Sequence, residues 1–285
     1  MPLAEGQVQL RDLVLGPGTP YRFVRGSHFN PFKRDVRADQ GGTRAWSSGS
    51  WSGAEWAEQV AVAMRLVILA RGPVDYMDRM SALLAAFAPA SSADVDLRFV
   101  IGGVEYLLRG RPRMVDPESR HVDGHTYVQA AFVALDPTIY SGVEHSTTLG
   151  LPSTVGGLTL PATAPLTVSA AVTSGRGSIT NAGTKATGLL VRVDGPVAEP
   201  RISLLTDVGT AVVRVWATLA AGQWLDIDTA ARTVYLNGTA SRRGVTTTDG
   251  TGWPVLPPGT YEIAFDASAY SAAATATVRW RDTWH

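Results

Sequence analysis

The sequence has no cysteine, only two lysines and no excess of either charge, because 25 basic residues balance 25 acidic ones. Without cysteine the chain cannot form disulfides, use a thiol nucleophile or hold zinc through thiolates, which fits folding in a reducing compartment. Proteins that hold nucleic acid or anionic membranes by bulk electrostatics carry a basic excess. The zero net charge therefore argues against both of those functions.

Long hydrophobic runs are missing as well. The longest apolar stretch, residues 60–70, contains Arg65 and falls far short of the roughly 20 residues that span a bilayer. We expect no membrane insertion, and no secretory signal, since the first residues carry neither a basic cluster nor an apolar segment. Of the 285 residues 45% are hydrophobic, which supports a substantial core and excludes wholesale disorder.

The composition changes near the middle of the chain and predicts two domains. Residues 146–165 are rich in Pro, Gly and Thr and carry no charge, a pattern typical of a linker. We therefore expect an N-terminal domain over residues 1–145 and a C-terminal domain over residues 166–285.

The front half combines one helix signal with several strand signals. Pro73 suits a first helical position, and Pro89 ends the run. Between them one apolar face recurs at helical spacing, formed by Tyr76, Met80, Leu83, Leu84 and Phe87. Strands are predicted over residues 8–15, 21–24, 58–69, 95–101, 104–108 and 127–134. The pair Gly102-Gly103 predicts a hairpin turn, because two glycines supply the positive φ that such a turn needs.

Residues 26–56 lack sustained periodicity and are interpreted as a long loop without regular structure of its own. Loops of this length inside a compact domain are often interaction elements, although a solvated surface loop is the plainer alternative. Arginine and tryptophan stand among its Gly-Ser clusters. The candidate interface residues are Arg34, Arg37, Arg44, Trp46 and Trp51.

The back half shows an all-β pattern. Strands are predicted over residues 166–172, 188–193, 201–205, 211–215, 224–227, 233–236, 261–265 and 274–280. Their even spacing, with turns such as Asn237-Gly238, is typical of a sandwich or barrel. In the last strand Val278 and Trp280 alternate with Arg279, so the C-terminus should be an integral strand with Trp280 as an anchor of the core.

Candidates for a metal site are weak. His121, Asp123 and His125 alternate and could share one strand face toward a metal ion. Gly124 favours a turn at the same place. We therefore expect no metal site.

Candidates for catalysis are weak too. Asp226 and Asp228 could form a carboxylate pair, but apolar neighbours alternate with them, so they are predicted to be the wet side of a half-buried strand. Residues 49–53 have Trp51 where a nucleophile elbow requires serine. We expect no catalytic residues and no cofactor.

The most specific segments lie in the back half and follow one another in a characteristic order. They are residues 178–184, 193–197, 200–202, 225–229, 232–234, 236–238, 256–259 and 278–282. In this order they resemble the C-terminal domain of siphovirus-type distal tail proteins, also called minor tail proteins, of phages of actinobacteria. The front half is similar, more loosely, to the N-terminal domain of that family.

The resemblance implies a mainly β structural virion protein: a ring-forming N-terminal domain with one helix, and a C-terminal antiparallel β-sandwich of the galectin-like or jelly-roll kind. It implies a homo-hexamer that continues the tail tube at the distal end of the phage tail, made in the host cytoplasm. The implied partners are the tail tube protein, the tape measure protein and the tail-tip or tail-fibre hub protein of the baseplate. The genome would pass through the lumen without specific binding.

Two other functions stay open at this point. One is a receptor- or carbohydrate-binding tail module, because β-sandwiches often bind glycans through exposed aromatic side chains. The other is a cell-wall hydrolase. Six-fold assembly without sugar affinity would favour the hub, glycan binding by the back half would favour the binding module, and release of peptidoglycan would favour the hydrolase.

Overall fold

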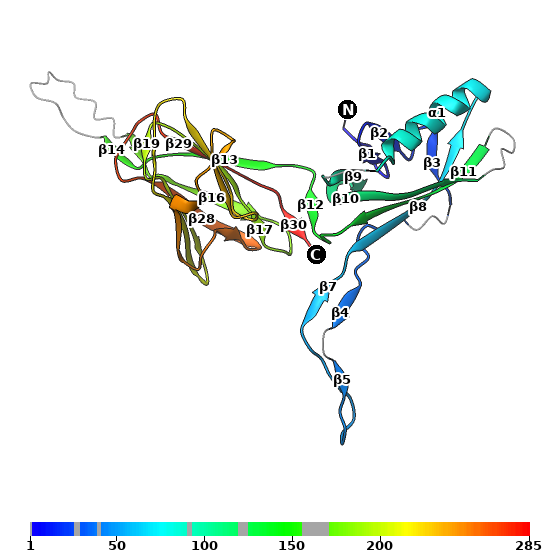
Figure 1. Cartoon of the computed structure of the whole chain (residues 1–285), viewed down its shortest axis with the longest axis horizontal. Helices are drawn as coiled ribbons and strands as arrows, with labels where there is room; N and C mark the ends of the chain where they lie inside the picture. Colours follow the sequence, from blue (N-terminus) through cyan, green and yellow to red (C-terminus); the bar gives the residue numbers. More distant parts are fainter. Residues whose placement is uncertain (1, 26–28, 39–40, 90–92, 119–124, 156–170) are drawn as a thin grey trace, which may run out of the picture. The chain divides into compact units, whose positions relative to one another are not determined.

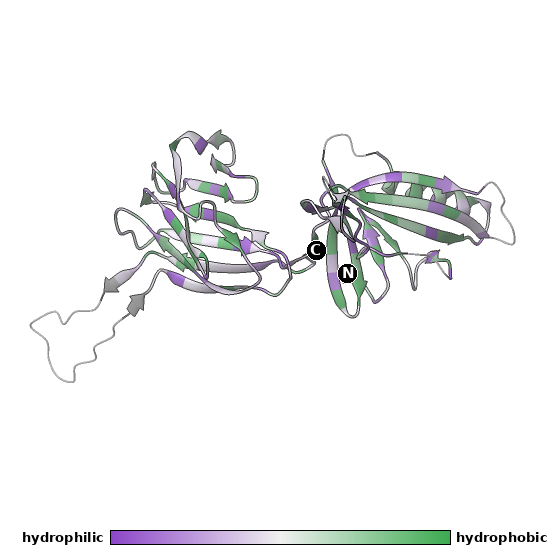
Figure 2. Ribbon diagram, turned by 90° about the horizontal axis from the view of Figure 1, so that it is seen from below, coloured by the Kyte–Doolittle hydropathy of each residue, from purple (hydrophilic) through white to green (hydrophobic). Residues whose placement is uncertain are grey.

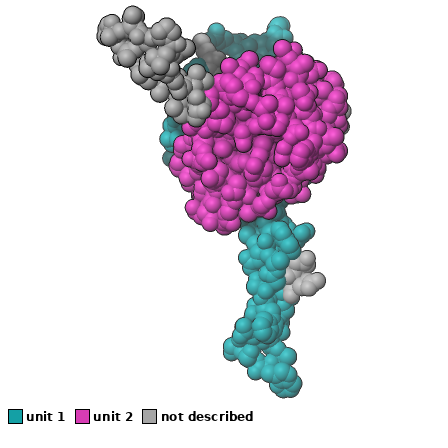
Figure 3. All heavy atoms as spheres, turned by 90° about the vertical axis from the view of Figure 1, so that its left-hand side faces the viewer, with its two compact units in different colours: residues 1–143, 284–285 teal, residues 144–283 magenta. Residues whose placement is uncertain are grey.

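The computed structural model divides the chain into two compact units (Figures 1 and 3). It describes residues 2–25, 29–38, 41–89, 93–118, 125–155 and 171–285. Unit 1 comprises Met1–Val143 and Trp284–His285, and unit 2 comprises Glu144–Thr283. The described residues form many antiparallel strands and one α-helix, which confirms the expected mainly β fold class.

Unit 1 is built on one antiparallel sheet with the strand order β2-β1-β9-β10-β11-β8-β3, while β12 pairs with β10 and β30 with β12. The strands are β1 (Val8–Leu10), β2 (Leu13–Leu15), β3 (Tyr21–Phe23), β8 (Val60–Leu69), β9 (Val95–Ile101), β10 (Val104–Pro117), β11 (His125–Ala134), β12 (Ile139–Ser141) and β30 (Thr283–Trp284). Just beyond β2, the N–H of Gly16 donates to the carbonyl of Tyr21 in β3 at 2.7 Å. The two edge strands therefore meet, and the sheet is nearly closed into a barrel.

The turn between β9 and β10 is the glycine hairpin that the sequence predicts. Gly102 and Gly103 have φ angles of +64° and +74°, a region in which glycine is unstrained. The carboxylate of Glu5 accepts both of their N–H groups, at 2.9 and 2.8 Å. The turn is thus held to the N-terminal segment of the same unit.

Helix α1 (Pro73–Ala86) lies over one face of this sheet (Figure 1). Its buried side chains, Met80, Leu83 and Ala86, join the core of unit 1. The hydroxyl of Tyr21 in β3 donates to the carbonyl of Arg79 at 2.9 Å and ties the helix to the sheet. The predicted helix is confirmed, but Leu84 is 44% exposed rather than buried, because it lies away from the line that Met80 and Leu83 share.

Strand β8 buries one of its two faces in the core. Its buried residues alternate with exposed or half-buried ones, because successive side chains of a strand point to opposite faces. Arg65 is the polar residue of the outward face, and hydrophobic residues are found along the strands of both units (Figure 2). The buried members of β8 are Val60, Val62, Met64, Leu66 and Ile68.

Unit 2 contains two larger antiparallel sheets. The first has the order β13-β29-β18-β23-β24-β25, with β13 (His145–Gly150), β29 (Thr275–Trp280), β18 (Leu190–Asp194), β23 (Trp224–Asp228), β24 (Thr233–Leu236) and β25 (Ala240–Ser241). The second has the order β16-β28-β20-β21-β26, with β16 (Arg176–Asn181), β28 (Gly259–Asp266), β20 (Arg201–Thr206), β21 (Gly209–Val215) and β26 (Thr246–Gly250). One hydrophobic cluster takes buried residues from both sheets, such as Val191 and Ile263, as in a sandwich.

Short paired strands and a 3-10 turn complete unit 2. The pairs are β14 (Ser153–Val155) with β15 (Ala171–Thr173), β17 (Thr187–Gly188) with β27 (Val255–Leu256), and β19 (Val197–Ala198) with β22 (Thr218–Leu219). The 3-10 turn η1 spans Arg243–Val245. It connects the end of the first sheet to β26 in the second.

The stretch expected to be a linker belongs in part to the second unit. Residues 145–150 form β13, which pairs along its whole length with β29. The β-branched Thr147 and Thr148 suit a strand, and the neighbouring Leu149 is buried in the core. The units divide between Val143 and Glu144, so the expected linker start at residue 146 is too late. Residues 156–170, with most of the strand expected over 166–172, lie outside the described residues.

Candidate assembly surfaces

Residues 36–38 and 41–57 form a long β-hairpin, here called the arm, instead of the expected loop without regular structure. The arm contains β4 (Val36–Ala38), β5 (Gly42–Thr43), β6 (Ser50–Trp51) and β7 (Glu55–Ala57), in which β4 pairs with β7 and β5 with β6. It leads into β8 and protrudes as a narrow extension of unit 1 (Figures 1 and 3). Every residue of its four strands is exposed.

Arginine–tryptophan pairs lie across the two strands of the arm. Arg37 faces Trp56 in register, and its guanidinium lies 5.9 Å from the centre of the indole ring. Farther out, the guanidinium of Arg44 lies 4.6 Å from the ring of Trp51. Trp46, in the turn at the tip, is fully exposed. Four of the five candidate interface residues therefore lie on the arm.

The fifth candidate, Arg34, lies at the base of the arm and not on its exposed strands. Its side chain turns back to donate to the carbonyls of Pro31 and Lys33, at 2.9 and 2.8 Å. Two other nitrogens of this guanidinium, Nε and Nη2, are buried without a hydrogen-bond partner. Burial lowers the pKa of Arg34 from its ordinary value. We therefore regard Arg34 as part of the attachment of the arm.

An aromatic cluster fixes the segment before the arm to the sheet of unit 1. Phe29 packs edge-on against Phe99 at 5.7 Å between ring centres, and Phe32 packs edge-on against Tyr106 at 5.4 Å. Trp284, near the C-terminus, contacts the other side of this cluster at 5.4 Å from Tyr106. The arm thus starts from a rigid base, although its own strands bury nothing.

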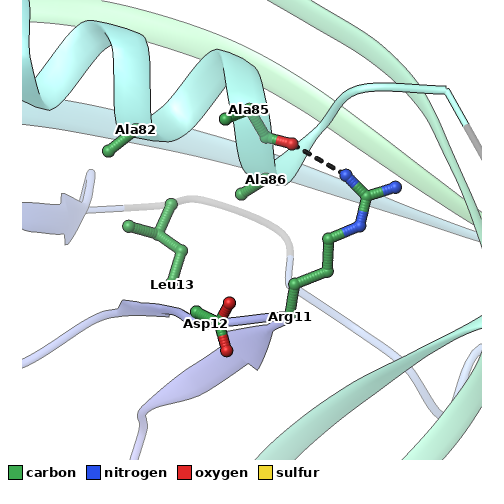
Figure 4. A pocket seen from close by; sticks show the side chains of 6 residues that line it. All are labelled: Arg11, Asp12, Leu13, Ala82, Ala85 and Ala86. Atoms are coloured by element: carbon green, nitrogen blue, oxygen red, sulfur yellow. Dashed lines mark hydrogen bonds between the residues drawn. The ribbon is translucent and has the colours of Figure 1, made fainter.

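A second partly apolar surface runs along α1. Val74, Met77 and Leu84 are 77%, 58% and 44% exposed. Beside the C-terminal end of the helix lies a hollow of about 290 Å³ (Figure 4). The hollow is lined by Arg11, Asp12, Leu13, Ala82, Ala85 and Ala86. Ligand pockets typically begin at about 300 Å³, so this hollow is at most a small one.

Arg11, which lines this hollow, caps the C-terminal end of α1. Removing its side chain should lower the stability of unit 1. Its guanidinium donates to the carbonyls of Ala85 and Ala88, at 2.7 and 2.8 Å, and so caps the C-terminus of α1. Because charged hydrogen bonds at a partly exposed site are lost, Arg11→Ala should cost about 1–2 kcal/mol of stability. Thermal unfolding measures this cost. Arg22→Ala, which removes an exposed arginine of β3, is the control, and equal melting temperatures for the two variants would contradict the capping role.

The structure describes three of the five residues considered for metal binding and catalysis, His125, Asp226 and Asp228. His121 and Asp123 lie outside the described residues, and His125 is exposed at the start of β11. No group of three His, Asp or Glu among the described residues could hold a metal ion. Asp226 accepts a hydrogen bond from the indole N–H of Trp224 at 2.9 Å, on the half-exposed side of β23.

Two of the segments that carry the sequence resemblance, residues 178–184 and 278–282, meet in a buried polar cluster of unit 2. The side-chain oxygen of Asn181 accepts the N–H groups of Gly183 and Thr283, at 3.0 and 3.3 Å. Asp282 accepts the N–H of Ala182 at 2.9 Å. A Cβ on Gly183 would lie 1.9 Å from the carbonyl oxygen of Thr283, so only glycine fits there. Segments about a hundred residues apart thus depend on each other's side chains.

The described helix is too short and too polar to cross a membrane, and the exposed surfaces present an arm and an apolar helix face. The fold therefore defines a two-unit β protein with surfaces suited to assembly. Residues 182–284 match the family "Siphovirus-type tail component, C-terminal domain", in agreement with the resemblance stated for the back half. No curated protein matches the chain by sequence.

Solved structures extend the likeness to nearly the whole chain. The Dit protein of phage SPP1, described as a paradigm of the hub adsorption apparatus in phages that infect Gram-positive bacteria, matches with a TM-score of 0.65 and 13% identity over 98% of this chain and 99% of that one. A chain of the activated phage p2 baseplate with Sr matches with a TM-score of 0.55 and 12% identity, over 96% of each chain. A chain of the same baseplate with Ca gives 0.54 and 12%, over 96% of this chain and 97% of that one. At this identity the likeness shows a shared fold.

Proposed function

We propose that this chain is a structural protein of the distal end of a siphovirus-type phage tail, where six copies form a hub ring. The observation that carries the proposal is the fold shared over 98% of this chain and 99% of the SPP1 Dit protein. The family match of residues 182–284 supports it independently, because that match rests on sequence.

The exposed arm is a further observation in favour of a ring. A closed ring needs one heterologous contact repeated around an axis, so each copy must offer two different surfaces. Isolated two-stranded hairpins are marginally stable in water, and exposed strand edges are ready to pair with another chain. Tryptophan and arginine are also the side chains that most often dominate the energy of protein contacts. The arm, with Trp46, Trp51 and Arg44, is therefore our proposed contact to the next copy within a ring of residues 1–145.

The proposed place in the virion is between the tail tube and the tail-tip proteins. There the ring would contact the tail tube protein, the tape measure protein and the tail-tip or tail-fibre hub protein, and the genome would pass through its lumen without specific binding. The chain would be made in the host cytoplasm. We propose no catalytic step for it, in keeping with its likeness to tail and baseplate proteins.

Mass photometry of the purified chain tests this function. We expect a species at six times the 30.2 kDa mass of one chain, either for the protein alone or after addition of the tail tube protein. A species that stays monomeric in the presence of the tube protein would refute the ring.

A further inference from the structure

A separate hollow on unit 2 has the features of a ligand site. It measures about 360 Å³, within the lower range of about 300–1,000 Å³ that small-molecule pockets occupy. It lies where the chain leaves β21, beside β25 and η1. Its lining residues are Trp216, Ala217, Ser241, Arg242, Gly244 and Val245.

The indole of Trp216 is held in place although it is 48% exposed. Its backbone N–H donates to the carbonyl of Val245 at 2.8 Å, and its ring N–H donates to the hydroxyl of Thr247 at 3.0 Å. The guanidinium of Arg214 stacks 3.7 Å from the ring centre, and Glu199 pairs with that guanidinium. An exposed ring held by a hydrogen bond at its N–H and by a guanidinium on one face loses little conformational entropy when a ligand packs on it.

Arg242 supplies a positive charge to the same hollow. The contact of its guanidinium is a long one, 3.3 Å to the carbonyl of Ser241. Among the residues that the structure describes, no carboxylate forms an ion pair with Arg242, and no acidic side chain lines the hollow. The guanidinium therefore keeps donors for an anion, which it can bind in the two-pronged way typical of carboxylates and phosphates.

Trp224, a half-buried tryptophan of β23 in the same unit, differs on this point. The guanidinium of Arg192 stacks 4.5 Å from the ring centre of Trp224, but it also pairs with Asp194 at 3.0 Å. The ring N–H of Trp224 donates to Asp226. The guanidinium of Arg192 and the ring N–H of Trp224 thus each have a carboxylate partner, whereas the charge of Arg242 has none among the described residues.

We propose that the hollow binds a sugar ring that carries an acidic group, either a carboxylate or a phosphate. The C–H groups on one face of a pyranose are apolar and slightly positive, so they pack favourably on the electron-rich face of an indole. The acidic group would reach the guanidinium of Arg242, and the hydroxyl of Ser241 could bond a sugar hydroxyl. The inference goes beyond the hub ring and does not depend on it, because the whole hollow belongs to unit 2.

Calorimetry on the full-length protein tests the proposal with four probes: glucuronic acid, glucose 6-phosphate, glucose and inorganic phosphate. We expect at least one acidic sugar to bind about tenfold more tightly than glucose and than inorganic phosphate. The sugar ring and the acidic group should each contribute to its binding free energy. The two acidic sugars together identify the acidic group. Trp216→Ala and Arg242→Ala should each weaken that binding by about tenfold or more.

Matched controls keep the test specific. Tyr270→Ala removes an exposed aromatic ring of unit 2, and Arg176→Ala removes an exposed arginine of β16, both outside the lining of the hollow, so both should leave binding unchanged. Trp216→Phe, which keeps a ring, should bind better than Trp216→Ala, and unchanged melting temperatures establish that the variants are folded.

Three results would overturn the proposal. The first is that neither acidic sugar binds better than glucose. The second is that inorganic phosphate binds as tightly as the acidic sugars. The third is that Trp216→Ala abolishes binding of the tail tube protein while no sugar binds, which would assign the hollow to a protein partner. Ring formation, measured separately by mass photometry, should be the same in all these variants.

Discussion

Shortening the arm is expected to abolish ring formation and to leave the fold of unit 1 intact. Arg37 and Trp56 face each other in register, so replacing residues 38–55 by Asn-Gly would close the hairpin with a two-residue turn. The replacement removes Arg44, Trp46 and Trp51, none of which contributes to the core of unit 1. Because the strands of the arm bury nothing within one chain, the loss should appear in assembly and not in stability.

Two measurements on the shortened protein separate these effects. Mass photometry should show monomers at concentrations at which the parent is expected to give the proposed hexamer, while the melting temperature should change by no more than about 2 °C. Met77→Ala with Leu84→Ala is the matched control, because it removes exposed apolar surface from α1 instead of the arm. Rings that persist without the arm, or that disappear in the α1 control alone, would place the contact between copies elsewhere.

Local patterns in the sequence predict some of the regular elements. Pro73 predicts the start of α1, and the apolar run over residues 60–69 predicts a strand where β8 lies, because each of these elements buries one face in a core. The exposure of Leu84 could not be predicted from such patterns. An apolar residue beside the buried line of a helix fits the periodic pattern equally well whether or not the sheet reaches it, and here the sheet does not.

The arm and the start of unit 2 were misread for physical reasons. A hairpin that buries nothing has no reason to alternate apolar and polar residues, so residues 36–57 carry no strand period. The pairing of Arg37 with Trp56 was the available signal, but it is visible only once the register is known. In β13, Thr147 and Thr148 look like linker residues by composition, although β-branched side chains also favour strands.

The hollow of unit 2 could not be predicted from the sequence. Trp216 and Arg242 are separated by an entire β-hairpin, and only the folded sandwich brings them to one site. The hydrogen bond from Trp216 to Thr247 also depends on the neighbouring strand β26, whereas the stack on Arg214 is local, because Arg214 stands two residues earlier in the chain. The sequence does contain the adjacent pair Arg242-Arg243 in a turn. By itself this pair indicates only a local positive charge at the surface.

Trp280→Ala is expected to destabilise unit 2 more than any other change considered for that unit. Trp280 ends β29, which lies between β13 and β18 in the first sheet, and it is 8% exposed. Its ring N–H donates to the carbonyl of Thr180 at 2.7 Å, and His145 stacks on the ring at 5.6 Å between centres. The integral strand expected to reach the C-terminus ends at Trp280 instead, and β30 follows as a separate short strand.

The size of the effect follows from the volume that is lost. Truncating a buried tryptophan to alanine leaves a cavity and costs about 3–5 kcal/mol, and here the carbonyl of Thr180 also loses its donor. For a unit of this size that cost should lower its melting temperature by about 10 °C or more, while unit 1 still forms rings. The melting temperature of Trp280→Phe should lie between those of the parent and Trp280→Ala, because phenylalanine keeps an aromatic ring but not the N–H group. Arg279→Ala, on the opposite face, loses a 3.9 Å pair with Glu144 at the surface and should cost less than about 1 kcal/mol. Calorimetry that found the same melting temperature for Trp280→Ala and the parent would show that this strand is not part of the core.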